Sequence, residues 1–170
     1  TGNIKNRAYI ENNLGIVYSN IKVFEKSLFY YLQALEHKKA LNDSAGMAST
    51  YINIGVLYES VKHDYNKALN QYQKAKAILD KSGLTPAKAS VYNNIGLILL
   101  HQNKLNDARE FLNTALSMQK SLQSKYGIAS TILNLALLSQ KEKDFKTSVA
   151  FANQSAEIYE QNNVKPKLAE

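Results

Sequence analysis

The sequence predicts an all-α fold built from four antiparallel helix pairs, and three observations support this prediction. A short block centred on a small residue recurs every 40 or 41 positions along the 170-residue chain. Small and aromatic residues within each repeat are spaced three, four and seven apart, which is the periodicity of helices and not of strands. Seven glycines and two prolines are too few for a fold rich in loops or β-turns.

The recurring block contains an asparagine, an apolar residue and then a small residue. The small positions of its four copies are Gly15, Gly55, Gly96 and Ala136. A second set of small residues follows each block: Ser27, Ala68, Ala108 and Ser148. Glycine costs about 1 kcal/mol in a helix interior relative to alanine. Its repeated use indicates that the two sets lie on facing helices, where a missing side chain makes room for a close contact.

Each repeat is expected to form two helices joined by a short polar turn. The turns are predicted at residues 20–23, 62–64, 102–104 and 141–144, and the units at 5–43, 44–84, 85–125 and 126–163. Residues 164–169 parallel residues 84–89, which open the third unit. We therefore expect 164–170 to start a further helix in a truncated fifth unit, and residues 1–170 to be a single array cut from a longer one.

The second repeat carries a pattern that resembles the tetratricopeptide repeat. The residues that form it are Tyr51, Ile54, Gly55, Tyr58, Ala68, Tyr72 and Ala75. The period is longer than the usual length of about 34 residues, and it is similar to the long variety found in kinesin light chains, spindle-orientation adaptors and bacterial signalling regulators. The resemblance implies a right-handed α-solenoid, a superhelix whose concave face binds a protein or peptide.

Two functions follow from this resemblance. The first is a non-catalytic scaffold that holds a protein or peptide ligand in its concave groove. The alternative is a sensor or regulatory segment of a bacterial signal-transduction protein, either a histidine kinase or a transcriptional regulator, whose effector domain lies outside this fragment.

One asparagine occupies the same register in all four repeats: Asn13, Asn53, Asn94 and Asn134. Asparagine is unfavourable inside a helix because its side chain competes for backbone hydrogen bonds. The resemblance places this side of the first helix on the concave face, where an amide can both donate to and accept from a peptide backbone. We expect the row to bind an extended peptide. The alternative is that each amide bridges to the adjacent unit, and both roles are compatible.

Neighbouring positions complete the expected groove. Further polar groups come from Asn12 and Asn93. An apolar strip lies one turn on: Ile16, Val56, Leu97 and Leu137. Glu59 and His101 lie further along the same side. Packing between units explains the apolar strip at least as well as ligand contact does.

Phe29 differs from its equivalents, because a large aromatic side chain occurs at this position only in the first repeat. We expect it to cover an upstream unit, and the alternative is a dimer contact. Self-association through exposed ends of the array is a related expectation, since solenoids need polar caps.

The net charge of +7 raises the question of an anionic partner. Nineteen of the 21 basic residues are lysines scattered along the chain, whereas recognition of bases and phosphates favours arginine. We expect no nucleic-acid contact by this segment. The longest apolar run, Ile95–Leu100, is too short to cross a bilayer, so we also expect no membrane insertion by this segment.

The sequence contains no catalytic motif that is supported by partner residues. Cysteine is absent, which excludes disulfides, thiolate metal sites and a cysteine nucleophile. His37, His63 and His101 share no metal-binding spacing, and the common phosphate-loop and nucleophile motifs are missing. We predict that the segment is not an enzyme and uses no cofactor. Its composition does not distinguish the cytoplasm from the periplasm.

Overall fold

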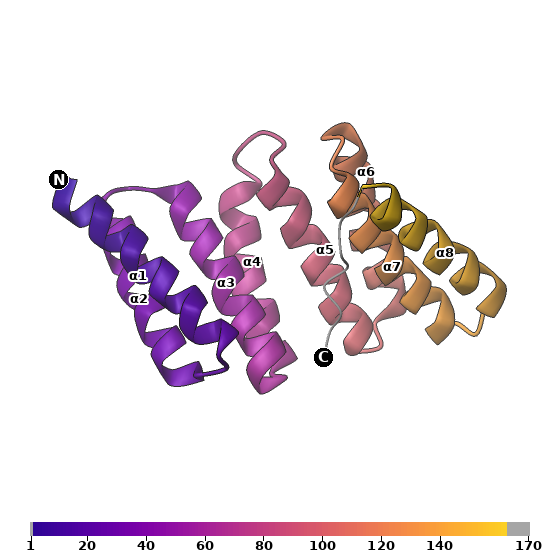
Figure 1. Cartoon of the computed structure of the whole chain (residues 1–170), viewed down its shortest axis with the longest axis horizontal. Helices are drawn as coiled ribbons and strands as arrows, with labels where there is room; N and C mark the ends of the chain where they lie inside the picture. The colour runs from indigo at the N-terminus through magenta and orange to yellow at the C-terminus, as the bar shows by residue number, and fades with distance from the viewer. Residues whose placement is uncertain (1, 163–170) are drawn as a thin grey trace. The chain divides into compact units, whose positions relative to one another are not determined.

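The computed structural model describes residues 2–162, which form eight α-helices and no strand (Figure 1). The helices are α1 (Gly2–Asn20), α2 (Phe24–Ala40), α3 (Ser44–Lys62), α4 (Tyr65–Leu79), α5 (Pro86–His101), α6 (Leu105–Ser121), α7 (Lys125–Lys141) and α8 (Phe145–Gln161). These bounds confirm the predicted all-α fold of antiparallel helix pairs, with the turns at the predicted places. The further helix expected at 164–170 lies outside the described residues.

The chain divides into two compact units, Thr1–Gly83 and Leu84–Glu170. In the first unit α1 packs on α2, α3 packs on α4, and α2 packs on α3. In the second unit the same relations join α5 with α6, α7 with α8, and α6 with α7. Each unit therefore contains two helix pairs, and the second helix of one pair packs on the first helix of the next. The finer division of the chain into four repeat units stays a prediction.

Side-chain caps fix the start of five helices. The side chain of the capping residue accepts a hydrogen bond from the backbone N–H three residues later in each case. The capping residues are Asp43, Asp64, Thr85, Ser124 and Asp144. Such a cap contributes about 1 kcal/mol, because it satisfies a backbone donor that has no partner inside the helix.

Left-handed residues reverse the chain between helices. Within the described residues, positive φ angles occur at Lys22, Asn42, His63, Asn103, Gln123 and Lys143. Each lies within two residues of a helix end. Glycine is the usual residue at such a position, since a side chain there costs roughly 1–2 kcal/mol. The turns at Lys22, Gln123 and Lys143 therefore contain strain that glycine would relieve, whereas asparagine, which stands at Asn42 and Asn103, enters this region more readily.

The glycine of the first helix faces a large side chain of the second helix in three of the pairs. A Cβ atom on Gly15 would lie 2.5 Å from the ring of Tyr31. A Cβ atom on Gly55 would lie 2.4 Å from the ring of Tyr72, and the same relation holds between Gly96 and Leu112. The space left by the missing side chain is thus filled mainly by a buried side chain from the facing helix.

The facing small residues are also where they were expected. Ser27 Oγ of α2 donates to the backbone oxygen of Gly15 in α1 at 2.8 Å. In the fourth pair alanine replaces glycine at Ala136, and the position of the large facing side chain is occupied by Ala152. The two changes compensate in size, which accounts for the departure of the fourth repeat from the pattern.

Candidate binding site

A buried polar cluster joins three helices of the first unit. Lys38 of α2 is only 8% exposed. Its Nζ donates to Thr50 Oγ1 of α3 at 2.6 Å and to Asn12 Oδ1 of α1 at 3.2 Å. Thr50 Oγ1 lies 3.0 Å from the same Asn12 oxygen. Burial lowers the pKa of the Lys38 ammonium group, and the nearby Asp43 carboxylate acts in the opposite direction.

The second unit contains an uncharged version of this cluster. Thr131 Oγ1 of α7 lies 2.7 Å from Gln119 Oε1 of α6 and 2.8 Å from Asn93 Oδ1 of α5. Asn134 Nδ2 donates to the same Asn93 oxygen at 3.0 Å. All four residues are buried. In the first unit the threonine hydroxyl accepts a hydrogen bond from the Lys38 ammonium group, whereas in the second unit it donates to the Gln119 amide oxygen, so an amide occupies the position of the ammonium group.

The two clusters show that the polar pattern recurs every two helix pairs and not in every pair. The lysine–threonine and glutamine–threonine pairs are both 12 residues apart, and the two asparagine–threonine pairs are both 38 residues apart. The repeat pattern of the sequence did not predict a role for Lys38, Thr50, Gln119 or Thr131. The available signal was threonine at the same register of the second and fourth repeats only, with Ile10 and Val91 at that register in the first and third.

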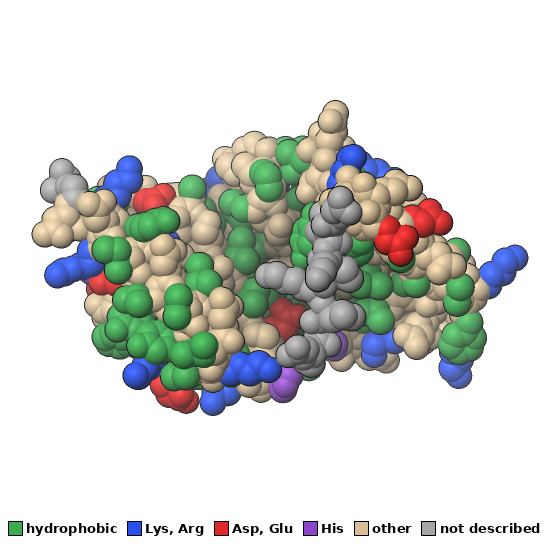
Figure 2. Space-filling view, in the orientation of Figure 1, with side chains coloured by type: hydrophobic (Ala, Val, Ile, Leu, Met, Phe, Trp, Pro, Cys, Tyr) green, Lys and Arg blue, Asp and Glu red, His purple; other side chains and the backbone are tan. Residues whose placement is uncertain are grey.

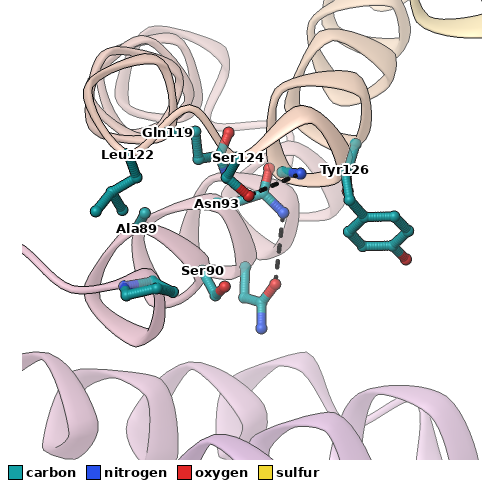
Figure 3. A pocket seen from close by; sticks show the side chains of 11 residues that line it. Ala89, Ser90, Asn93, Gln119, Leu122, Ser124 and Tyr126 are labelled. Carbon is teal, nitrogen blue, oxygen red and sulfur yellow. Dashed lines mark hydrogen bonds between the residues drawn. The ribbon is translucent and has the colours of Figure 1, made fainter. Parts of the chain in front are cut away.

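A cavity of about 290 Å³ opens beside the cluster of the second unit (Figure 3). It is lined by Pro86, Ala89, Ser90, Asn93, Asn94, Gln119, Leu122, Ser124, Tyr126, Gly127 and Ser130. None of these side chains is charged. Asn93 Nδ2 points toward Asn94 Oδ1 at 3.5 Å, and Ser124 Oγ accepts from the Gly127 N–H at 3.3 Å. The cavity thus offers neutral hydrogen-bonding groups, with apolar contacts from Leu122 and Tyr126.

The four asparagines of the predicted row differ in exposure. Asn13, Asn53 and Asn94 are half-buried. Asn134 is 7% exposed, and its amide bridges from α7 to Asn93 of α5. The alternative of bridging between helix pairs therefore holds at this position. Asn94 alone of the four lines the cavity, and contact of the row with a ligand stays a prediction.

The remaining predicted residues fall into three groups. Asn12 and Asn93 belong to the two polar clusters described above. The apolar strip is partly accessible: Ile16, Val56 and Leu137 are exposed, and Leu97 is half-buried. His101 is exposed at the end of α5. The structure brings Asn93, Asn94 and Asn134 together, and it places the others at separate positions along the first helices.

Glu59 is half-buried and has a partner within its own helix pair. Its Oε2 accepts a hydrogen bond of 2.7 Å from the Tyr72 hydroxyl of α4. Burial raises the pKa of the Glu59 carboxyl group, and the bond from Tyr72 lowers it by a smaller amount. The same tyrosine ring fills the space at Gly55. Glu59 therefore helps to hold α3 and α4 together.

Two further properties concern residues 2–162 as a whole. No group of three or more histidine and acidic residues in this part of the chain could hold a metal ion. None of its helices combines the length and the apolar character needed to cross a membrane.

A family model described as "Tetratricopeptide repeat" matches residues 6–81, 61–121 and 87–161, which together cover most of the chain. The chain belongs to the tetratricopeptide repeat family. Curated relatives of this tetratricopeptide repeat chain include the protein O-mannosyl-transferase TMTC3 of Mus musculus and of Homo sapiens, each 28% identical over 131 residues. The match covers 72% of this chain and 14% of either relative. The chain thus spans about one seventh of the length of these relatives.

Solved structures share the tetratricopeptide repeat fold. BtubC (BKLC) from P. vanneervenii has a TM-score of 0.78 at 20% identity, covering 95% of this chain and 66% of that one. A Rap protein complexed with competence and sporulation factor has a TM-score of 0.83 at 20% identity, covering 92% and 44%. The Rap conjugation gene regulator of plasmid pLS20, in complex with the Phr* peptide, has a TM-score of 0.75 at 19% identity, covering 88% and 42%. At these identities the likeness concerns the fold.

Proposed function

We propose that this tetratricopeptide repeat chain is a non-catalytic binding module that holds an extended peptide against the first helices of its pairs. The neutral polar cavity beside Asn94 carries the proposal. It is open enough to admit side chains, and it is lined by amide and hydroxyl groups that can both donate and accept. The family membership of the chain and the peptides bound by the two Rap proteins are consistent with this function.

The chemistry of the cavity selects the class of peptide. A charged side chain entering it would lose water without meeting an opposite charge, which is unfavourable. A backbone amide, or the side chain of asparagine, glutamine, serine or threonine, would exchange its water for Ser90, Asn94 and Ser130. Tyr126 and Leu122 would cover the apolar part of the same residue. The preferred ligand is therefore an uncharged, polar peptide segment.

Selection from a library of random displayed peptides, followed by calorimetric titration, tests the proposal. We expect uncharged polar sequences to be enriched. The variant Ser90→Trp places a large ring in the cavity, and Asn94→Ala removes the amide. Each should weaken the selected peptides at least about tenfold, equivalent to about 1.4 kcal/mol.

The matched control is Ser117→Trp, which introduces the same ring at an exposed position of α6 outside the cavity. It should leave the affinity unchanged, and circular dichroism should give the same helicity for all three variants. Peptides that bind the Ser90→Trp and Asn94→Ala variants as well as the unmodified chain would contradict the proposal, as would a selection that yields only charged sequences.

The second candidate function is a sensor segment of a bacterial signal-transduction protein, such as a histidine kinase or a transcriptional regulator. The likeness to two Rap proteins bound to peptides favours it. A sensor must change shape when its ligand binds, whereas a scaffold need not. Small-angle scattering of the chain with and without a selected peptide separates the two functions. A changed radius of gyration at saturation supports the sensor, and an unchanged one supports the scaffold.

A further inference from the structure

The residues that line the cavity of the second unit have counterparts in the first unit. A constant offset of 81 residues relates residues 5–49 to residues 86–130. At this offset six of the eleven lining positions hold the same residue in both units, and in the first unit these are Ala8, Asn12, Asn13, Leu41, Gly46 and Ser49. Only five of the other 34 positions in this range are identical. The lining is therefore repeated more closely than the helices that carry it.

The surroundings of the repeated residues are also alike. Asn13 is half-buried like Asn94, and Gly46 is half-buried like Gly127. The N–H of each glycine donates to the side chain three residues before it, at 2.8 Å in the first unit and 3.3 Å in the second. The repeated residues therefore form the same local structure in both units.

We call the six identical residues, together with Lys38 and Asp43, the first-unit surface. All of them belong to α1, α2, α3 or the turn that joins α2 to α3. Figure 2 shows both basic and acidic side chains at this end of the first unit, near the turn between α2 and α3. The lining of the second unit, in contrast, contains no charged side chain.

Lys38 is the main chemical difference between the two surfaces, because it stands at the position of Gln119. Lys38 is 8% exposed and Gln119 is 4% exposed. Gln119 nevertheless lines the cavity of the second unit, so a side chain that is buried to this extent can still belong to the wall of a binding site. The first-unit surface thus presents an ammonium group where the second unit presents an amide.

The charge of Lys38 is not neutralised inside the chain. Lys38 takes part in none of the ion pairs formed by residues 2–162. Its Nζ has three N–H donors, and in this part of the chain it has two acceptors, Thr50 Oγ1 and Asn12 Oδ1. Burial of a charge without an opposite charge is unfavourable, and Gln119 shows that an amide is sufficient at this position. The fold requires neither the charge nor the third N–H, and both are suited to an anion.

The Asp43 carboxylate acts against an anion at this surface. Asp43 is exposed, and its Oδ1 accepts the capping hydrogen bond from the Gly46 N–H. Its charge reaches Lys38 and reduces the attraction that a ligand would feel. In the second unit the uncharged Ser124 makes the same cap. The charge of Asp43 can therefore be removed without loss of the cap.

We propose that the first-unit surface is a second binding site, which takes the carboxylate of an aspartate or glutamate side chain of a peptide. The carboxylate accepts the third N–H of Lys38 and a hydrogen bond from the amide of Asn13, and the bond from the ammonium group is charge-assisted. Leu41 contacts the methylene groups of the same side chain. The site shares no residue with the cavity of the second unit, so it goes beyond the binding of an uncharged segment proposed above.

Two blocked pentapeptides test the proposal, one with glutamate at its centre and one with glutamine in its place. NMR titration of the isotope-labelled full chain follows the backbone amides of Gly46 and Ser49. The glutamate peptide should shift both signals to saturation, and the glutamine peptide should bind there at least about tenfold more weakly. Added salt should weaken the glutamate peptide. Equal binding of the two peptides at these amides, or no shift with either, would overturn the proposal.

The variant Lys38→Gln separates the charge from the fold. Glutamine reproduces the uncharged arrangement of the second unit, so the helicity should be kept while the glutamate peptide binds about tenfold more weakly. The matched control Lys39→Gln removes the same charge from the next residue, which is exposed and outside the first-unit surface, and it should leave the affinity unchanged. Undiminished binding to the Lys38→Gln variant, or an equal loss in the control, would overturn the proposal.

The variant Asp43→Ser tests the site by a gain of affinity. Serine keeps the cap, as Ser124 does, and it removes the negative charge near Lys38. The glutamate peptide should therefore bind severalfold more tightly. An affinity that is unchanged or weaker would show that the carboxylate does not lie beside Lys38.

The amides of Gly127 and Ser130 report separately on the cavity of the second unit. If the peptide function proposed for that cavity is wrong, the glutamine peptide leaves these two signals unmoved while Gly46 and Ser49 still respond to the glutamate peptide. If the acidic site is wrong, Gly46 and Ser49 stay unmoved whatever the second unit binds.

Discussion

Lys38 and Gln119 occupy the same position in two different helix pairs, and each contacts a threonine that follows it by 12 residues. The ammonium group and the amide thus perform the same structural task in two units of one chain. Because Gln119 is uncharged, a hydrogen-bonding group at this position is sufficient to hold the threonine, and a charge is not needed.

The substitution Lys38→Gln is expected to stabilise the first unit at neutral pH. The amide can bond to Thr50 and Asn12 without the desolvation penalty that lowers the pKa of Lys38. Lys38→Met has a side chain of similar length without a donor. It should instead lower the free energy of unfolding by about 1–3 kcal/mol, because Thr50 and Asn12 each lose a hydrogen-bond partner. Urea unfolding followed by circular dichroism measures both changes.

The pH dependence provides a second readout for Lys38. The folded chain binds the titrating proton of Lys38 less tightly than the unfolded chain does. The free energy of unfolding should therefore rise as the pH increases from the lowered pKa of the folded chain to the ordinary lysine pKa of 10.5. The Lys38→Gln variant should lose this part of the slope. An equal slope in both proteins would show that the buried ammonium group is not its source.

Gly55→Ala is expected to destabilise the second helix pair. The new Cβ would lie 2.4 Å from Tyr72 Cε1, so the ring or the helix must move, and overpacking of this kind costs about 1–3 kcal/mol. Gly83→Ala is the control, since nothing lies within 4 Å of its Cβ position. Thermal unfolding should show a lower midpoint for the first variant and little change for the second; equal midpoints would count against the close contact.

Glu59→Gln should raise stability above the ordinary glutamate pKa. Burial raises the pKa of Glu59 from 4.5, so the folded chain holds this proton more tightly than the unfolded chain does. The free energy of unfolding therefore falls as pH rises through the interval between the unfolded and folded values. Glutamine can still accept the bond from Tyr72 and does not titrate. Unfolding free energies measured across this interval should decline for the unmodified chain and stay flatter for the variant.

Lys143→Gly is expected to stabilise the turn between α7 and α8. Lys143 has a φ of 66°, and glycine removes a strain of roughly 1–2 kcal/mol while it adds flexibility to the unfolded chain worth about 0.5–1 kcal/mol. The net gain should reach about 1 kcal/mol in thermal unfolding. Lys141→Gly, at the end of α7, is the contrasting variant and should destabilise the helix. A loss of stability in both variants would contradict the argument.

The helix pairs could be predicted because their determinants are local. Gly55, Tyr58, Ala68 and Tyr72 lie within one repeat, and their spacing alone places them on two facing helices. The same locality predicted the turns, where a polar residue such as Asp64 caps the next helix.

The polar clusters could not be predicted in the same way, because their members come from three helices. The bond between Thr131 and Asn93 joins residues that are 38 positions apart, and it depends on how one pair packs on the next. A comparison of the four repeats one by one treats Asn134 as a member of an exposed row. Only the packing of α5, α6 and α7 shows that its amide is used internally.

Threonine and an aliphatic residue alternate at one register of the four repeats: Ile10, Thr50, Val91 and Thr131. This alternation limits which helix pairs can be removed or duplicated. Removing α3 and α4 would join α2 to α5, and Lys38 would then face Val91, so its ammonium group would lose the Thr50 oxygen and keep only the oxygen of Asn12. Removing α3 to α6 would join α2 to α7, and Lys38 would again meet a threonine, Thr131. Duplication or loss of helix pairs in steps of two keeps a threonine opposite Lys38, whereas loss of one pair replaces it with a valine.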